Sequence, residues 1–181
     1  MEYCIAPAII AEDHEELRRK ILLVKNEASR IHVDIMDGEF VPRKSNWFAF
    51  SLPAFKGVYE AHLMVKNVLG WLKRKEVKHF DILVIHAEID SHDALREIIQ
   101  RVRRMKKEVV LALNPETSWE KYGDLFEVVD GVQIMAVHPG QYGASFIPKV
   151  VEKVKRLREH FPSLQIQVDG GENEKNIALM K

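Results

Sequence analysis

The sequence predicts an α/β fold, a TIM-type (β/α) barrel of parallel strands whose eighth strand–helix unit is missing. Short apolar segments alternate seven times with helical segments, at a spacing of roughly 25–30 residues, which is typical of a parallel sheet with helical crossovers. No GxGxxG motif follows any predicted strand, which favours a barrel over a Rossmann sheet. A complete barrel typically needs about 200–250 residues or more. The 181 residues are therefore expected to form one domain, residues 1–181, that lacks about one unit.

The first half of the chain supplies three of the strands and two helices. Residues 3–10 are predicted to form a short apolar strand that ends at or near Pro7. Apolar residues at helical spacing predict a helix over residues 12–24. Alternation of apolar and polar residues predicts the next strand over residues 31–36. A loop, a strand and a helix are predicted to follow at residues 38–53, 58–64 and 69–75.

The second half supplies the other four strands. Apolar residues at helical spacing predict an amphipathic helix over residues 92–105. A weaker helix is predicted over residues 118–126, with Thr117 or Ser118 as its N-cap. The remaining predicted elements are strands at residues 81–86, 109–113, 132–137 and 164–168 and a helix at residues 148–160.

Charge and composition argue against several classes of protein. Lys and Arg together number 27, as do Asp and Glu, so binding to nucleic acid or to a membrane surface has no electrostatic support. No apolar run is long enough to span a bilayer, and the first strand begins too early to leave room for a signal peptide, which predicts a cytoplasmic protein. Cys4 has no partner for an internal disulfide, and its apolar neighbours predict a buried structural thiol.

The strand at residues 31–36 places a histidine and an aspartate on one face. Its apolar residues point to one side, while His32, Asp34 and Met36 point to the other. Burying a polar group without a partner costs roughly 2–7 kcal/mol, and a charge costs more. A metal ion bound by both side chains would remove this cost, and so would a hydrogen bond between His32 and Asp34. The strand alone leaves both interpretations open.

Other predicted strands also end on side chains that can bind a metal. His62 lies near the end of the third strand, and Asp169 follows the seventh. In a (β/α) barrel the C-terminal ends of the strands carry the active site, so these side chains are expected to converge with His32 and Asp34. Two histidines and two aspartates suit one divalent ion such as Zn²⁺, Mn²⁺, Fe²⁺ or Co²⁺.

Several short motifs occur in a fixed order along the chain. They are Ile5-Ala6-Pro7, His32-Val33-Asp34-Ile35-Met36-Asp37-Gly38, Phe40-Val41-Pro42, His62-Leu63-Met64, Ala112-Leu113-Asn114-Pro115 and Val168-Asp169-Gly170-Gly171. Together they closely resemble the ribulose-phosphate 3-epimerase family, and the resemblance runs from residue 5 to the last residue. It implies a (β/α)8 barrel isomerase of the pentose phosphate pathway that interconverts D-ribulose 5-phosphate and D-xylulose 5-phosphate.

The resemblance implies a role for each matching residue. It implies metal ligands at His32, Asp34, His62 and Asp169, with Asp34 and Asp169 also acting as acid and base in C3 epimerisation through an enediolate. The implied substrate-contacting positions are Ala8, Met36, Met64, Met135, Gly140, Gly143, Gly170 and Gly171. Of these, the methionines would surround the reacting carbons and the glycines would belong to phosphate-binding loops. The implied partner is a sugar phosphate, and we expect a homo-oligomer.

The chain departs from the family pattern in three places. The family usually has serine where Ala8 stands, and Tyr142 replaces a glycine in the loop from His138 to Gly143. A side chain at position 142 would crowd a phosphate or disfavour a positive φ. The chain also ends before the family's eighth strand, whose Gly-Ser turn completes the phosphate site. Either a neighbouring chain or a rearranged element covers the resulting gap, or the gene product is truncated.

Two alternatives stand beside this epimerase. The residues at positions 8 and 142 suggest an epimerase for another sugar or sugar phosphate. A catalytically silent barrel fragment that still binds metal or partners is a different class, and the intact set of four ligands argues against it. His86 and Glu88 have ligand-like spacing, but a supporting or packing role is favoured for them.

Overall fold

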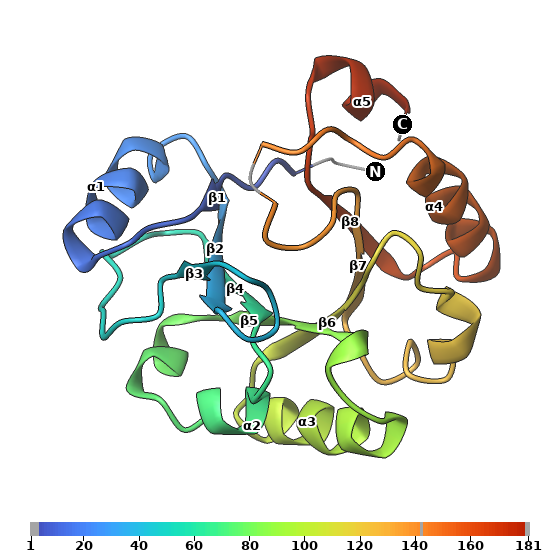
Figure 1. Ribbon diagram of the computed structural model, residues 1–181, viewed down its shortest axis with the longest axis horizontal. Coiled ribbons are helices and arrows are strands. Elements are labelled where there is room, and N and C mark those ends of the chain that lie inside the picture. The colour runs from blue at the N-terminus through green and yellow to red at the C-terminus, as the bar shows by residue number, and fades with distance from the viewer. Residues whose placement is uncertain (1–3, 142, 180–181) are drawn as a thin grey trace.

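Parallel strands follow one another around a curled sheet that carries the helices on its outer side (Figure 1). The computed structural model describes residues 4–141 and 143–179. The parallel strands are β1 (Ala8–Ile9), β2 (Arg30–Asp37), β4 (Val58–Met64), β5 (Ile82–His86), β6 (Glu108–Leu113), β7 (Gly131–Met135) and β8 (Gln165–Asp169). Within the described ranges, β1 and β8 lie at the two ends of the sheet and do not pair with each other. The fold is therefore an open, incomplete (β/α) barrel, which confirms the predicted fold class.

Helices and short 3₁₀ helices follow the strands along the chain. The helices are α1 (His14–Val24), α2 (Val68–Trp71), α3 (His92–Arg104), α4 (Lys149–His160) and α5 (Glu174–Leu179), and the 3₁₀ helices are Lys75–His79, Ala87–Ile89 and Trp119–Tyr122. The segment predicted as a loop after β2 contains one further strand, β3 (Lys44–Ser45), which pairs antiparallel with the end of β2. Helix α1 begins where the side chain of Asp13 accepts a hydrogen bond from the backbone N–H of Glu16 at 2.8 Å.

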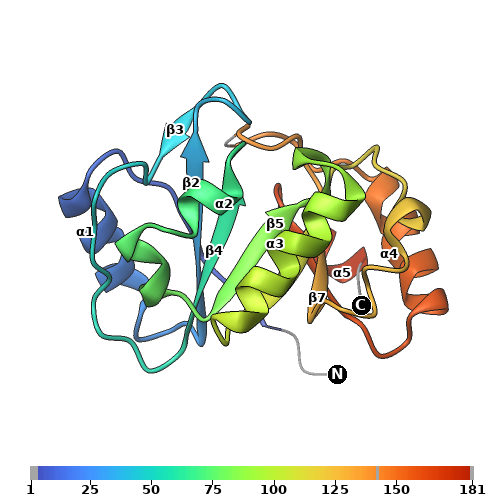
Figure 2. The ribbon, with the colours of Figure 1, turned by 90° about the horizontal axis from the view of Figure 1, so that it is seen from below.

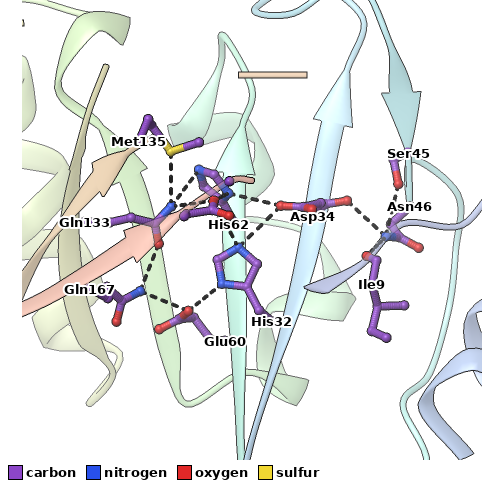
Figure 3. Close-up of polar contacts among 12 residues, drawn as sticks. Ile9, His32, Asp34, Ser45, Asn46, Glu60, His62, Gln133, Met135 and Gln167 are labelled. Carbon is purple, nitrogen blue, oxygen red and sulfur yellow. Dashed lines mark hydrogen bonds and ion pairs between the residues drawn. The ribbon is translucent and has the colours of Figure 1, made fainter. Parts of the chain in front are cut away.

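Strand β2 is buried on two faces of different chemistry. Its odd-numbered apolar residues belong to the core cluster that also contains Leu17 and Ile21 of α1. The alternate residues His32, Asp34 and Met36 are also buried. His32 and Asp34 face the interior of the curled sheet (Figure 3), and alternation along the strand places Met36 on the same face. One face thus attaches the strand to the helical layer, and the other supplies polar groups to the interior.

The first strand differs from its prediction. The strand predicted from the sequence ends near Pro7, but β1 begins directly after this residue. Proline has no N–H group to donate to a β-ladder. Its carbonyl oxygen does accept a hydrogen bond from the backbone N–H of His32, at 3.1 Å. Cys4 is exposed, so the prediction of a buried thiol is wrong. It precedes β1 at the edge of the open sheet, where the described residues supply no further strand. Its Sγ lies 3.3 Å from Oγ of Ser29.

Two predicted helices are shorter than expected. The segment 118–126 contains only the 3₁₀ helix Trp119–Tyr122. The hydroxyl of Ser118 donates to the carboxylate of Glu120 instead of capping the backbone, so the first N–H groups receive no side-chain cap. The helix predicted at residues 69–75 is reduced to the single turn of α2. None of the helices in the described ranges is long and apolar enough to cross a lipid bilayer.

Asn46 ties the short β1 to β2. Its side-chain amide donates to the carbonyl oxygens of Ile9 and Asp34 at 3.0 Å and 2.9 Å. The residue is buried and has a φ of 49°, in the left-handed region that asparagine tolerates better than most residues. Because β1 is only two residues long, these two hydrogen bonds are a substantial part of its attachment.

Replacing Asn46 with alanine is expected to lower the free energy of unfolding by about 2–4 kcal/mol. Two buried hydrogen bonds are lost at about 1 kcal/mol each, and a left-handed backbone costs alanine about 1–2 kcal/mol. Asn46→Gly loses the same bonds without the backbone strain, so it should destabilise the protein less. Urea unfolding of both variants measures the difference, and a wild-type stability of Asn46→Gly would contradict the role of the two bonds.

Candidate metal centre

The register between β2 and β4 sets polar side chains next to one another. His32 pairs with Glu60 and Asp34 pairs with His62 across these parallel strands. Paired residues of neighbouring strands point to the same face, which here is the interior of the curled sheet (Figure 3). All four residues are at most 7% exposed.

Asp169, at the C-terminal end of β8, completes a cluster that we call the ligand cage: His32, Asp34, His62 and Asp169. Oδ1 of Asp34 lies 3.0 Å from Nδ1 of His62 and 3.3 Å from Nε2 of His32. Oδ2 of Asp169 lies 3.2 Å from Nδ1 of His62 and 3.7 Å from Nε2 of His32. The structure thus brings together all four of the residues predicted as metal ligands.

The ligand cage has the donor set and the spacing of a divalent metal site. One nitrogen or oxygen atom from each residue lies within 4.8 Å of the others. Ligands about 2.0–2.1 Å from a tetrahedral zinc ion lie roughly 3.3 Å apart, and the nitrogen–oxygen distances of 3.0–3.7 Å bracket that value. Nε2 of His32 is buried between two carboxylates, yet it makes no hydrogen bond to any described residue. The simple His32–Asp34 hydrogen bond is therefore not formed, and the residues present could hold a metal ion.

The second ring nitrogen of each cage histidine, which points away from the aspartates, contacts a further polar side chain. Nδ1 of His32 lies 2.6 Å from Oε1 of Glu60. Nε2 of His62 lies 2.8 Å from Nε2 of His86, whose Nδ1 lies 3.3 Å from Oε2 of Glu88. Burial lowers the pKa of His86, which favours the neutral ring. Since Glu88 can only accept, a neutral His86 donates from Nδ1 and accepts at Nε2. His62 therefore keeps a proton on Nε2, and once its second proton is lost, Nδ1 faces the cage as a lone pair.

The charges of the cage govern its protonation. Burial lowers the pKa of His32, but the adjacent carboxylates of Asp34 and Glu60 outweigh burial and raise the pKa well above its usual value. Burial also lowers the pKa of His62, and Asp169 and Asp34 outweigh it and raise that pKa. Burial raises the pKa of Asp34, but the adjacent imidazoles of His32 and His62 hold the pKa far below its usual range. Without a metal, the cage therefore favours protonated histidines beside an ionised Asp34.

A polar layer beneath the cage is absent from the sequence-based prediction. It consists of Arg30, Glu60, Gln133 and Gln167, each two residues before His32, His62, Met135 or Asp169 on the same strand. Side chains alternate along a strand, so a polar residue two positions before a ligand points into the same interior. That spacing is the signal in the sequence that could have identified the layer.

The methionines predicted to contact substrate lie at the same end of the sheet. Met36 and Met64 are register partners and form an apolar cluster with Val41. Met135 is the register partner of Asp169. All three methionines are at most 3% exposed. The ligand cage is therefore bordered by buried thioether side chains.

The glycines predicted to bind phosphate all have a positive φ. The values are 79° for Gly140, 74° for Gly143, 111° for Gly170 and 72° for Gly171. A Cβ atom at position 140 would lie 2.8 Å from Cβ of Val41, so the segments after β2 and β7 meet at one end of the barrel (Figure 2). Tyr142 lies outside the described residues.

Two features of this end concern the substrate. Ala8 is exposed and is the register partner of His32, so it presents only a methyl group on the cage side of the sheet. The backbone N–H of Gly170 donates to Oε2 of Glu172 at 3.0 Å. A carboxylate thus already uses one of the backbone donors that the sequence assigned to phosphate.

Comparisons with known proteins agree on one family. A family model described as "Ribulose-phosphate 3 epimerase family" matches residues 4–181. The cytoplasmic isoform of ribulose-phosphate 3-epimerase from Oryza sativa subsp. japonica is 33% identical over 178 residues, covering 92% of this chain and 76% of that protein. The enzyme of that name from Helicobacter pylori is 32% identical over 180 residues, covering 96% and 82%. That from Bacillus subtilis is 31% identical over 186 residues, covering 97% and 84%.

A solved structure supports the fold alone. The crystal structure of orotidine 5'-monophosphate decarboxylase from Sulfolobus solfataricus superposes with a TM-score of 0.60 at 12% identity, covering 97% of this chain and 84% of that one. At this identity the similarity says nothing about the reaction.

His62→Ala is expected to weaken the binding of Zn²⁺ or Co²⁺ by at least about 100-fold, because it removes one of four ligands. Titration of the metal-free protein against a chromophoric chelator measures the affinity. His14→Ala, at an exposed position on α1, is the matched control and should bind as the wild type does. An unchanged affinity in His62→Ala would remove His62 from the ligand set.

The metal-free protein is expected to lose stability between about pH 7 and about pH 8, by up to about 1.4 kcal/mol for each histidine whose folded pKa is raised across that window. Folded His32 and His62 retain protons that the unfolded chain, with a histidine pKa of about 6.5, has already released. The window ends near pH 8 because burial lowers the pKa of Lys153 to about 8, which adds stability above it.

Urea unfolding in the presence of a chelator measures this trend. With excess Zn²⁺ the trend should reverse, since the metal binds deprotonated histidines more tightly as the pH rises. A metal-free stability that rises over the same window would contradict the raised pKa values.

Proposed function

The chain belongs to the ribulose-phosphate 3-epimerase family, and on that premise we propose that it inverts C3 of a ketopentose phosphate, interconverting D-ribulose 5-phosphate and D-xylulose 5-phosphate. One observation carries the proposal. Two carboxylates, Asp34 of β2 and Asp169 of β8, reach one ligand cage from strands that are not neighbours. Inversion at carbon needs a proton acceptor on one face of the substrate and a proton donor on the other, and this pair can supply both.

The two aspartates exchange roles in the proposed reaction. One carboxylate removes the C3 proton next to the C2 ketone, which leaves an enediolate, and the other carboxyl group returns a proton to the opposite face of C3. The reverse reaction uses the same groups in the opposite order. A divalent ion bound by His32, Asp34, His62 and Asp169 would supply electrostatic stabilisation of the negative charge on the substrate oxygens.

The surroundings of the cage suit a reactive carbanion-like species. Met36, Met64 and Met135 border the cage with side chains that carry no acidic proton, so they exclude water without quenching the enediolate. Backbone N–H groups at the positive-φ glycines are the proposed partners of the phosphate group; these are Gly140, Gly143, Gly170 and Gly171.

The remaining parts of the proposal concern the state of the protein. We propose one bound divalent ion, Zn²⁺, Fe²⁺, Mn²⁺ or Co²⁺, in a single barrel domain over residues 1–181. A cytoplasmic location is supported by the name of the rice relative, which is called a cytoplasmic isoform. Assembly into a homo-oligomer stays a prediction from the sequence.

A second candidate is an epimerase for a sugar that lacks the phosphate group. Ala8 offers no hydroxyl on the cage side of the sheet, and the carboxylate of Glu172 holds the N–H of Gly170. A carboxylate at a phosphate-binding turn repels an anionic substrate, so this contact favours a neutral sugar end. The carboxylate of an exposed side chain can also turn away, which keeps the phosphorylated substrate as the first candidate.

Deuterium incorporation at C3 in heavy water tests the reaction. The metal-loaded chain is expected to exchange the C3 proton of D-ribulose 5-phosphate and to form D-xylulose 5-phosphate. Asp34→Asn and Asp169→Asn should each slow interconversion by about 10²–10⁴-fold, because each removes one acid–base group. Asp93→Asn, at an exposed position on α3, is the matched control.

The same assay with unphosphorylated D-ribulose separates the two candidates. Faster exchange on the unphosphorylated sugar would favour the second candidate. Metal binding without exchange on either sugar would contradict both, and near-normal activity in either aspartate variant would contradict the two-carboxylate mechanism.

A further inference from the structure

The ligand cage joins residues from two distant parts of the sheet. His32, Asp34 and His62 lie on β2 and β4, which pair directly over seven register positions. Asp169 lies on β8, which is separated from β4 by β5, β6 and β7 and pairs on one edge only within residues 4–141 and 143–179. Small shifts at each strand pair would accumulate along this path. Metal and catalytic geometry tolerates only about 0.5 Å of error, so a more direct link is needed.

A chain of side-chain hydrogen bonds crosses the interior and supplies that link (Figure 3). Nε2 of Gln133 donates to Oδ2 of Asp169 at 2.9 Å. Oε1 of Gln133 accepts from Nε2 of Gln167, its register partner, at 2.8 Å. Nε2 of Gln167 also donates to Oε1 of Glu60 at 3.1 Å, and the same oxygen lies 2.6 Å from Nδ1 of His32. We call this path from Asp169 to His32 the amide bridge.

The direction of the amide bridge is fixed at both of its ends. Nη1 of Arg30 donates to Oε1 of Gln167 at 3.0 Å, and a guanidinium group cannot accept. Gln167 must therefore turn its NH₂ group toward Glu60 and Gln133. Gln133 in turn presents its oxygen to Gln167 and its NH₂ group to the carboxylate of Asp169, which can only accept. One arrangement of the two amides satisfies the contacts with Arg30, Glu60 and Asp169.

Because the amide bridge is buried, the loss of any one of its side chains is expected to disrupt it. Gln133 is 0% exposed and Glu60 is 1% exposed, so water cannot replace a lost partner at either residue. A buried polar group that loses one partner suffers the desolvation penalty in full. The side chain of Gln133 also touches the cage directly, with Nε2 3.3 Å from Nε2 of His62.

We propose that Gln133 and Gln167 are positioning residues that fix the carboxylate of Asp169 relative to His32, and that they thereby set the metal affinity of the ligand cage. This inference rests on the metal site of the proposed function and not on the reaction. It explains how a strand at the end of an open sheet holds a ligand in register with ligands from two other strands. The contact with Asp169 predicts that a change at Gln133 or Gln167 acts on the oxygen ligand from β8.

Titration of the metal-free chain with Co²⁺ tests the proposal. Gln133→Met and Gln167→Met keep the side-chain length but remove the amide, and each is expected to weaken Co²⁺ binding by about 10–100-fold. The visible absorption spectrum of bound Co²⁺ should change as the oxygen from Asp169 leaves its place, a shift that a purely structural role would not produce. The Co²⁺ affinity of the double variant should lie within about twofold of the affinity of the weaker-binding single variant. Both changes break the same path, so their effects should not multiply.

Matched variants complete the design. Gln165 lies on the same strand as Gln167 but is exposed, so Gln165→Met should bind Co²⁺ as the wild type does. Gln167→Glu keeps the shape but loses the NH₂ donors, so it should weaken binding as Gln167→Met does. If Gln133→Met does not fold, the two variants at Gln167, which is only partly buried, decide the question.

The outcomes separate this inference from the proposed epimerase. Wild-type affinity and an unchanged Co²⁺ spectrum in the Gln133 and Gln167 variants would overturn the amide bridge, whatever the catalytic result. Affinity losses that multiply in the double variant would also overturn it, because they would show two independent effects. A wild-type chain that binds Co²⁺ but does not exchange the C3 proton would contradict the epimerase and leave the metal titrations to decide the bridge.

Discussion

The register of β2 against β4 is the constraint on which the rest of the site depends. A shift by one residue would turn His32 and Asp34 toward the helical layer and bring apolar residues into the interior, since side chains alternate along a strand. A shift by two residues would keep the faces but separate Asp34 from His62. The odd-numbered residues of β2 belong to the same buried core as Leu17 and Ile21. A one-residue shift would take them out of that core, so ordinary apolar contacts help to determine the geometry of the polar site.

The sequence was sufficient for six of the seven parallel strands in the described residues and for the four residues of the ligand cage, because alternation in a strand and the order of strands in a barrel are both local or regular signals. It was not sufficient for the amide bridge. Gln133 and Gln167 are polar residues of ordinary appearance until the register of β7 and β8 places them side by side. Their partner Glu60 is 107 residues away from Gln167, a contact that no local pattern encodes.

The errors at Cys4 and at the first strand share a physical cause. Cys4 and the first strand were predicted from apolar composition, which assumes that an apolar segment finds neighbours on both sides. Among residues 4–141 and 143–179, β1 pairs only with β2, and Cys4 just before it is exposed. The fold is similar to that of a decarboxylase at only 12% identity. This is expected where the apolar layers specify the barrel and the interior residues specify its chemistry.

The protonation of the ligand cage has a consequence for its net charge. At a pH below the raised pKa values of His32 and His62, the empty cage holds two imidazolium ions and two carboxylates, which sum to zero. A divalent cation with two neutral imidazoles and the same carboxylates also sums to zero. Loading the site is therefore an ion exchange at constant charge, two protons for one cation. The four cage residues are electroneutral in both states, so loading the site adds no net charge to the interior.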